Sequence, residues 1–208
     1  MLYDRFTRLL HLFIATGIFG QMGVSLIMIH PKPGRPGDIF FEMHETLGLI
    51  LLGVLVVNWV WVLIRQGKVA PGLLFPWFTW SRYGDILRDI QRYWSHIRQF
   101  TLPDTNQPSP LASSIQGVGL SAATLLGATG TILFFGITDH GTMPGWVHDV
   151  KELHEIFGSL LWLYLIVHAS MGILHQLSGH GSMRIMLRVW EKADEQNAQI
   201  EKVTSGNR

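Results

Sequence analysis

The stretch HEIFGSLLWLYLIVH, residues 154–168, decides the fold because it is a long apolar run with a histidine at each end. A continuous apolar run without alternation favours a helix over a strand. Fourteen residues are almost four helical turns, so both imidazoles project from nearly one face, about 21 Å apart along the axis. An ionisable group at membrane depth is costly, and such a histidine therefore indicates function.

Three more apolar stretches resemble this one in length. Hydrophobic residues make up 48% of the 208-residue chain and charged residues only 15%, against about 25% charged residues in a soluble domain. A helix needs about 20 apolar residues to cross the hydrocarbon core of a membrane. We therefore predict an all-α integral membrane protein, a four-helix bundle without a cleavable signal peptide. The predicted spans are about residues 8–29, 42–64, 114–137 and 153–176.

Positive charges give the predicted orientation. Of the 16 Lys and Arg residues, all but Lys32, Arg35 and Lys151 fall on one side of the predicted spans, and cytoplasmic loops are enriched in such residues. Both termini and the loop 65–112 are therefore predicted to be cytoplasmic. We expect one membrane domain over residues 1–190, followed by a polar cytoplasmic tail, residues 191–208.

The cytoplasmic loop contains an amphipathic segment at about residues 83–98. Its apolar residues recur at helical spacing, with Arg88, Arg92 and Arg98 between them, which is typical of a helix lying at a membrane interface. A docking surface for a partner protein is the alternative interpretation.

Histidine is the main candidate metal ligand. The chain has ten histidines and no cysteine, which excludes thiolate-bound clusters and covalently attached c-type haem. Four histidines lie at membrane depth, and their positions predict an outer pair, His44 with His154, and an inner pair, His11 with His168. A zinc site needs three or four ligands at one level, whereas two ligands at each of two levels suit two haem irons.

Glycines accompany these histidines. His44-Glu-Thr-Leu-Gly48 and His154-Glu-Ile-Phe-Gly158 share the pattern His-Glu-x-x-Gly, and Gly17 lies in the first span. A glycine one turn from a ligand leaves room for a macrocycle, so we predict that these glycines line the cofactor. Close helix packing in lipid is the alternative role of such small residues.

His175 is an intermediate case, because it lies seven residues beyond His168 near the cytoplasmic boundary. It is an alternative to His168 as a ligand, or it contacts a haem propionate or lines a quinone pocket with Arg8, Arg184 or Arg188. The remaining histidines are expected in loops or interfaces: His30, His96, His140, His148 and His180.

Together these features resemble a known family. The stretch YDRFTRLLH at residues 3–11, His44, the spacing from His154 to His168, and His175 with Arg184 are similar to the bacterial cytochrome b561 family. The resemblance spans about residues 3–188 and extends to the b-type cytochrome subunits of membrane-bound hydrogenases. It implies two haem b groups with bis-histidine ligation, a bacterial inner membrane location and electron exchange with the quinone pool. Some relatives oxidise superoxide at the outer face and reduce ubiquinone at the inner face.

Three hypotheses of function remain open. The first is a quinone-linked electron-transfer oxidoreductase, with superoxide or a periplasmic electron carrier as its partner. The second is a haem-bearing membrane anchor subunit of a larger respiratory complex or dehydrogenase. The third is a proton or metal transporter that uses the histidines. Apart from lipid and quinone, the first two imply a protein partner or carrier, and we expect no nucleic-acid partner.

Overall fold

The fold consists of helices throughout the part of the chain that the computed structural model describes, residues 4–65, 82–99, 101, 109–138 and 141–178. The helices are α1 (Arg5–Ser25), α2 (Ile39–Arg65), α3 (Tyr83–Arg98), α4 (Pro110–Gly136) and α5 (Gly145–Leu177). The predicted tail, residues 191–208, and the predicted boundary at residue 190 lie outside the described residues.

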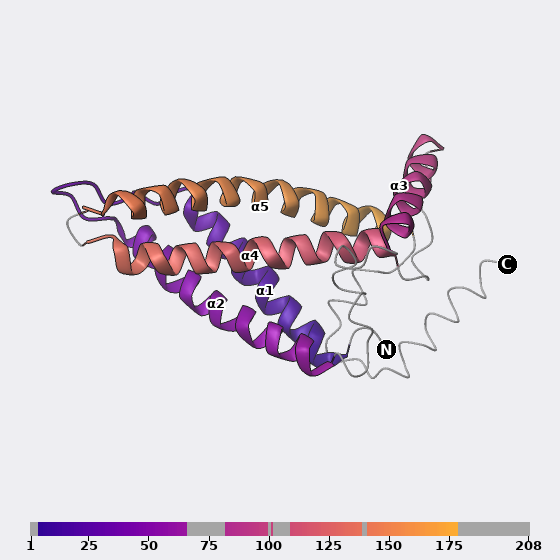
Figure 1. Ribbon diagram of the computed structural model, residues 1–208, viewed down its shortest axis with the longest axis horizontal. Coiled ribbons are helices and arrows are strands. Elements are labelled where there is room, and N and C mark those ends of the chain that lie inside the picture. Colours follow the sequence, from indigo (N-terminus) through magenta and orange to yellow (C-terminus); the bar gives the residue numbers. More distant parts are fainter. Residues whose placement is uncertain (1–3, 66–81, 100, 102–108, 139–140, 179–208) are drawn as a thin grey trace.

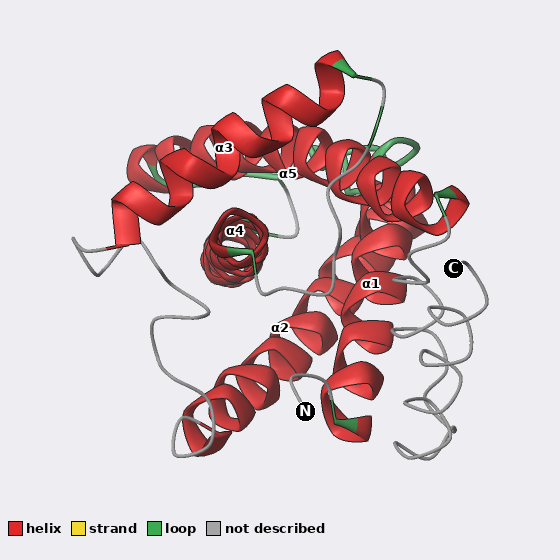
Figure 2. Ribbon diagram, turned by 90° about the vertical axis from the view of Figure 1, so that its right-hand side faces the viewer, coloured by secondary structure: helices red, strands yellow, loops and turns green. Residues whose placement is uncertain are grey.

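The four long helices lie side by side, and α3 crosses one end of them (Figures 1 and 2). The closely packed neighbours are α1 with α2, α2 with α4, and α4 with α5. Towards the end that carries the N-terminus, α1 and α2 lean away from α4 and α5 (Figure 1). Helix α5 therefore packs mainly against α4. Its two histidines nevertheless face histidines of α1 and α2.

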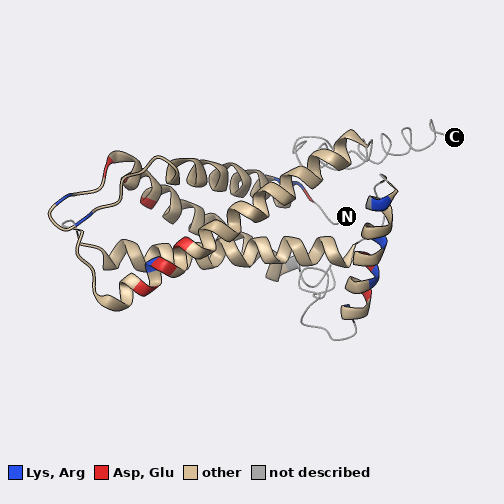
Figure 3. Cartoon of the chain, turned by 90° about the horizontal axis from the view of Figure 1, so that it is seen from above, with Lys and Arg blue, Asp and Glu red and all other residues tan. Residues whose placement is uncertain are grey.

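Three of these helices are long and apolar enough to cross a membrane, within the described residues: α2 over Ile39–Ile64, α4 over Pro110–Gly136 and α5 over Gly145–Leu177. Charged residues gather at the two ends and on α3, and the middle of the long helices lacks them (Figure 3). Large apolar side chains point outward, with Phe19 on α1 76% exposed and Phe135 on α4 80% exposed. Outward apolar faces of this extent indicate contact with lipid.

Helix α1 is not among these three, because it carries Arg5, Arg8, His11 and Gln21 within 21 residues. Its crossing of the membrane therefore stays a prediction. Its start is well defined, since the Asp4 side chain accepts a hydrogen bond from the Thr7 N–H at 2.8 Å, the usual role of an N-cap residue.

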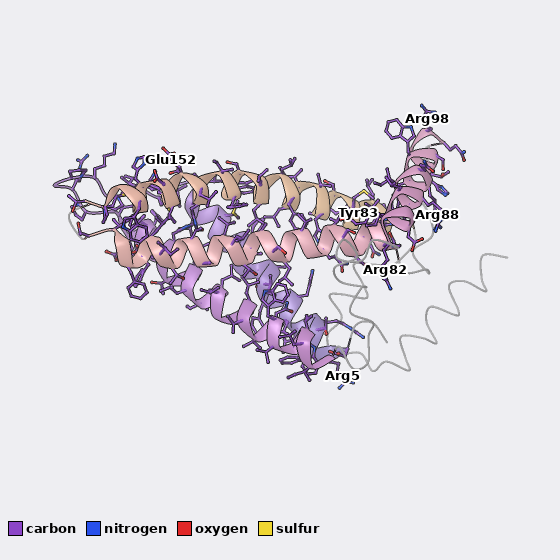
Figure 4. The ribbon with its side chains drawn as sticks, viewed as in Figure 1. Arg5, Arg82, Tyr83, Arg88, Arg98 and Glu152 are labelled. Carbon is purple, nitrogen blue, oxygen red and sulfur yellow. The ribbon has the colours of Figure 1, made fainter. Side chains whose placement is uncertain are left out.

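Helix bounds differ from the predicted spans mainly at α5, which begins at Gly145 after Pro144 rather than near residue 153. The first three turns carry most of the charged residues of α5, with Lys151 paired to Glu155 and His148 3.6 Å from Glu152. Helical backbone continues into this polar segment, whereas hydropathy marks only the apolar part of a helix. Glu152 marks this end of α5, opposite α3 (Figure 4).

Helix α3 is held against the start of α4 by a buried carboxylate. Ser109 caps α4 by accepting from the Ala112 N–H at 3.0 Å, and its hydroxyl donates to Asp89 at 2.6 Å. Asp89 also accepts from the Leu111 N–H at 3.3 Å, so a negative charge lies at the positive end of α4. Burial raises the pKa of Tyr93, which faces Ser109 from the same side of α3.

Candidate functional site

The inner histidine pair joins the first and last helices. His11 on α1 and His168 on α5 face each other with ring centres 6.5 Å apart and ring planes 51° apart. Tyr164, one turn before His168, stacks on the His168 imidazole with ring centres 5.3 Å apart and planes 14° apart. The structure therefore brings together two residues that are 157 positions apart in sequence, as the depth argument predicted.

The outer pair joins α2 and α5. The rings of His44 and His154 have centres 6.4 Å apart and are nearly perpendicular, at 81°. Helix α5 is continuous through both of its histidines, so the two pairs lie about 21 Å apart along its axis. Within the described residues, no three His, Asp or Glu side chains cluster as a zinc site would require.

The spacing of both pairs fits one metal ion between two imidazoles. A metal–imidazole bond is about 2 Å long and the bound nitrogen lies about 1 Å from its ring centre, so two rings on opposite sides of one ion have centres about 6 Å apart. A direct hydrogen bond of about 3 Å between two ring nitrogens would instead bring the centres to about 5 Å. The observed 6.5 and 6.4 Å match the first arrangement.

Helix α4 has no histidine, and it faces the site side chains of α5 with glycines. A Cβ atom placed on Gly130 would lie 3.3 Å from Cε1 of His154, and one on Gly119 would lie 2.1 Å from Cζ of Tyr164. These glycines are eleven residues apart, about three helical turns, so they occupy one face of α4, at the levels of His154 and of Tyr164. Their missing side chains allow α5 to approach α4 closely at both levels.

Polar groups surround the outer pair. Thr129 Oγ1 lies 2.8 Å from His154 Nδ1, and the Gln21 amide donates to the His44 carbonyl oxygen at 2.8 Å. Two buried atoms, Gln21 Oε1 and His44 Nδ1, have no hydrogen-bond partner among the described residues. Buried polar atoms are usually satisfied, so these two are compatible with an additional group at this level.

The three predicted glycines have different surroundings. Gly17 on α1 faces Leu51 of α2, where a Cβ atom would lie 3.0 Å from Cδ1. Gly48 faces the Gln21 amide at the same distance from Nε2, and Gly158 has open space around it. Gly17 and Gly48 therefore lie at the contact between α1 and α2, and Gly158 is the one with room beside it.

Two further predicted residues lie beyond the inner pair, towards the end of the bundle where α1 begins and α5 ends. Arg8 is 2% exposed on α1 and His175 is 7% exposed on α5, three and seven residues from His11 and His168 respectively. A buried arginine so close to a membrane is unusual and indicates an anionic or polar partner. The other predicted residues of this group, Arg184 and Arg188, lie outside the described residues.

Sequence reasoning missed Thr129, Gln21 and Tyr164. Tyr164 had a usable signal, because it precedes His168 by four residues and such residues share a helix face. Gln21 is an amide within an apolar helix, which is a functional signal in membranes. Thr129 had no comparable signal, since hydroxyl residues in apolar helices commonly bond to their own backbone.

Comparison with known proteins identifies the family of the chain. The family model described as prokaryotic cytochrome b561 matches residues 2–188. No curated protein and no solved structure matches the chain in the corresponding searches. The match covers nearly the whole chain and all the described helices. The chain therefore belongs to the prokaryotic cytochrome b561 family, whose membership implies haem b binding and electron transfer in a membrane.

Proposed function

We propose that this chain is a di-haem b cytochrome that transfers electrons across the bacterial inner membrane to or from the quinone pool. The observation that carries the proposal is the presence of two histidine pairs, with ring centres 6.5 and 6.4 Å apart. Each pair has one member on the continuous helix α5. His11 and His168 hold the inner haem, and His44 and His154 hold the outer haem. When bound, each haem supplies a one-electron carrier near one side of the membrane.

The chain's own residues set the kind of chemistry. Two imidazoles per iron leave no open coordination position, which favours outer-sphere electron transfer over oxygen activation. Gly17, Gly48 and Gly158 are proposed to line the macrocycles, and Gly158 has the space for it. Glycines 119 and 130 of α4 allow α5 to approach at the two levels.

The proposed membrane arrangement is a four-helix bundle over residues 1–190, with α1, α2, α4 and α5 crossing and both termini in the cytoplasm. The outward Phe13 and Phe19 on α1, 55% and 76% exposed, support the crossing of this fourth helix. Helix α3 lies across the end of the bundle where α1 begins (Figure 1), and we propose that this is the cytoplasmic end. Its exposed Leu87, Ile90 and Trp94 favour a position in the membrane interface.

The proposed quinone site lies at the cytoplasmic end, beside the inner pair. Arg8 and His175 are buried there, and their chemistry suits a haem propionate or a quinone carbonyl oxygen, to which both side chains donate. The proposed electron partner at the outer face is superoxide or a periplasmic carrier. The alternative, a haem-bearing anchor subunit, predicts that the purified chain alone neither reduces nor oxidises a quinone.

Haem quantification and reduced-minus-oxidised spectra on the purified chain test the proposal. We expect two b haems per wild-type chain, and one remaining in each of the variants His44→Ala and His168→Ala. His148→Ala is the matched control on α5, because His148 is exposed and faces Glu152, and it should keep both haems. If either His44→Ala or His168→Ala retained two haems, the ligand assignment would be wrong.

A further inference from the structure

The Thr129 hydroxyl contacts both the backbone of its own helix and a proposed haem ligand. Its Oγ1 lies 2.8 Å from the Leu125 carbonyl oxygen, 3.2 Å from the Leu126 carbonyl oxygen and 2.8 Å from His154 Nδ1. A hydroxyl has one proton to donate and can accept as well. With its proton on the Leu125 carbonyl, its oxygen accepts from an N–H at Nδ1 of His154.

The direction of this hydrogen bond bears on the tautomer of His154, whose ring also has a backbone hydrogen bond to Leu126. A neutral imidazole carries one ring proton, so an N–H at Nδ1 leaves the lone pair on Nε2. Nε2 is then the nitrogen available to an iron. The opposite direction, with Thr129 donating to Nδ1, would place the ring proton on Nε2 and block ligation.

The two histidines of the outer pair differ in the hydrogen bonding of their Nδ1 atoms. His154 has Thr129, whereas His44 Nδ1 is buried without a hydrogen-bond partner among the described residues. Thr129 is itself buried, at 8% exposed, so water competes poorly for its hydroxyl. A ligand imidazole whose second nitrogen donates a hydrogen bond is better oriented and more basic.

We propose that Thr129 is a positioning residue that fixes the ligating tautomer of His154 and lowers the reduction potential of the outer haem. This inference rests on the proposed function, because it assumes that His154 is a haem ligand. A more basic imidazole stabilises ferric iron more than ferrous iron, which lowers the midpoint potential. Removing the acceptor should therefore raise the potential of one haem and leave the other unchanged.

Thr129→Val tests this inference, because valine has nearly the same shape and lacks the hydroxyl. Potentiometric titration of the purified protein is expected to show that one midpoint potential is raised by about 59 mV. This shift corresponds to a change of about tenfold in the affinity of the site for ferric relative to ferrous iron, for a one-electron couple. Titration in the His168→Ala background, where only the outer haem is expected, identifies which haem shifts. Haem content and the reduced spectrum are recorded alongside.

Two further variants serve as controls. Thr131→Val removes a hydroxyl from the same helix that likewise donates to a carbonyl four residues back, Gly127 at 2.8 Å, and it should leave both potentials unchanged. Thr129→Ser keeps the hydroxyl and should behave like wild type, including in haem content if Thr129→Val loses the outer haem.

Several results would overturn the inference. They are two unchanged potentials in Thr129→Val, equal shifts of both haems, loss of both haems, or a Thr129→Ser variant that behaves like Thr129→Val. Failure of the proposed function looks different, since the wild type would then lack two haems, or His154→Ala would retain both.

Discussion

Replacing Gly119 with alanine should disturb the inner histidine pair without touching either histidine. The new Cβ atom would lie 2.1 Å from Cζ, 2.4 Å from Oη and 2.6 Å from Cε1 of Tyr164. Carbon atoms in contact are about 3.5–4.0 Å apart, so the tyrosine ring has to move by more than about 1 Å. Because Tyr164 stacks on His168, this movement removes the support of the His168 imidazole.

Overpacking of this kind costs about 1–3 kcal/mol, and here the displaced group is a large ring held between two helices. We expect Gly119→Ala to lower the thermal stability of the detergent-purified protein and to weaken or broaden the spectrum of one haem. Gly53→Ala on α2 is the control, because a Cβ atom there meets nothing within 4 Å. The control should keep both haems and the wild-type spectrum.

A double-mutant cycle isolates the contact, because residues in contact have non-additive effects on stability. In the Tyr164→Leu background the obstructing ring is gone, so Gly119→Ala should cost much less stability than in the wild type. If Gly119→Ala cost the same in both backgrounds, or left stability and spectra unchanged in the wild type, the close approach of α5 to α4 at this level would be refuted.

Two further substitutions test the loop and helix contacts. Gly141 has a φ of +71°, and a Cβ atom there would lie 2.5 Å from the Lys32 carbonyl carbon. Gly34 has a φ of +80° and open space around it, so Gly34→Ala costs only the backbone strain of about 1–2 kcal/mol. Gly141→Ala should therefore lower the melting temperature more than Gly34→Ala. Equal effects would show that the loop after α1 and the loop after α4 do not touch. Asp89→Asn removes the charge that accepts from Ser109 and should speed trypsin cleavage after Arg92 and Arg98 of α3 at unchanged haem content. Asp85→Asn, which breaks only the ion pair with Arg88, should not; equal cleavage of both would contradict the docking of α3.

Spacing within one helix could be predicted from the sequence. The positions of His154 and His168 on α5, and their opposition to His44 and His11, follow from helical rise and from depth in an apolar span. The pairs at 6.4 and 6.5 Å match that expectation.

Apart from the two histidine pairs, contacts between helices could not be predicted in this way. The sequence pattern His-Glu-x-x-Gly led to Gly48 and Gly158, whereas the glycines that meet site side chains on α5 are Gly119 and Gly130 of α4. The period of a single helix shows which residues share its face, but not which neighbouring helix that face meets. The contact between Thr129 and His154 was missed for the same reason.

The region between the two histidine levels helps to separate electron transfer from proton transport. Leu161 lies seven residues from both His154 and His168, about 10 Å from each along α5, and it is 3% exposed. It packs in a core with Ile18, Met22, Leu55 and Ala123 from the other three long helices. A proton needs a chain of polar groups or water to cross such a layer, whereas an electron does not. The wild-type protein in liposomes should therefore leave their proton permeability unchanged, and a proton leak through the wild type would favour the transporter instead.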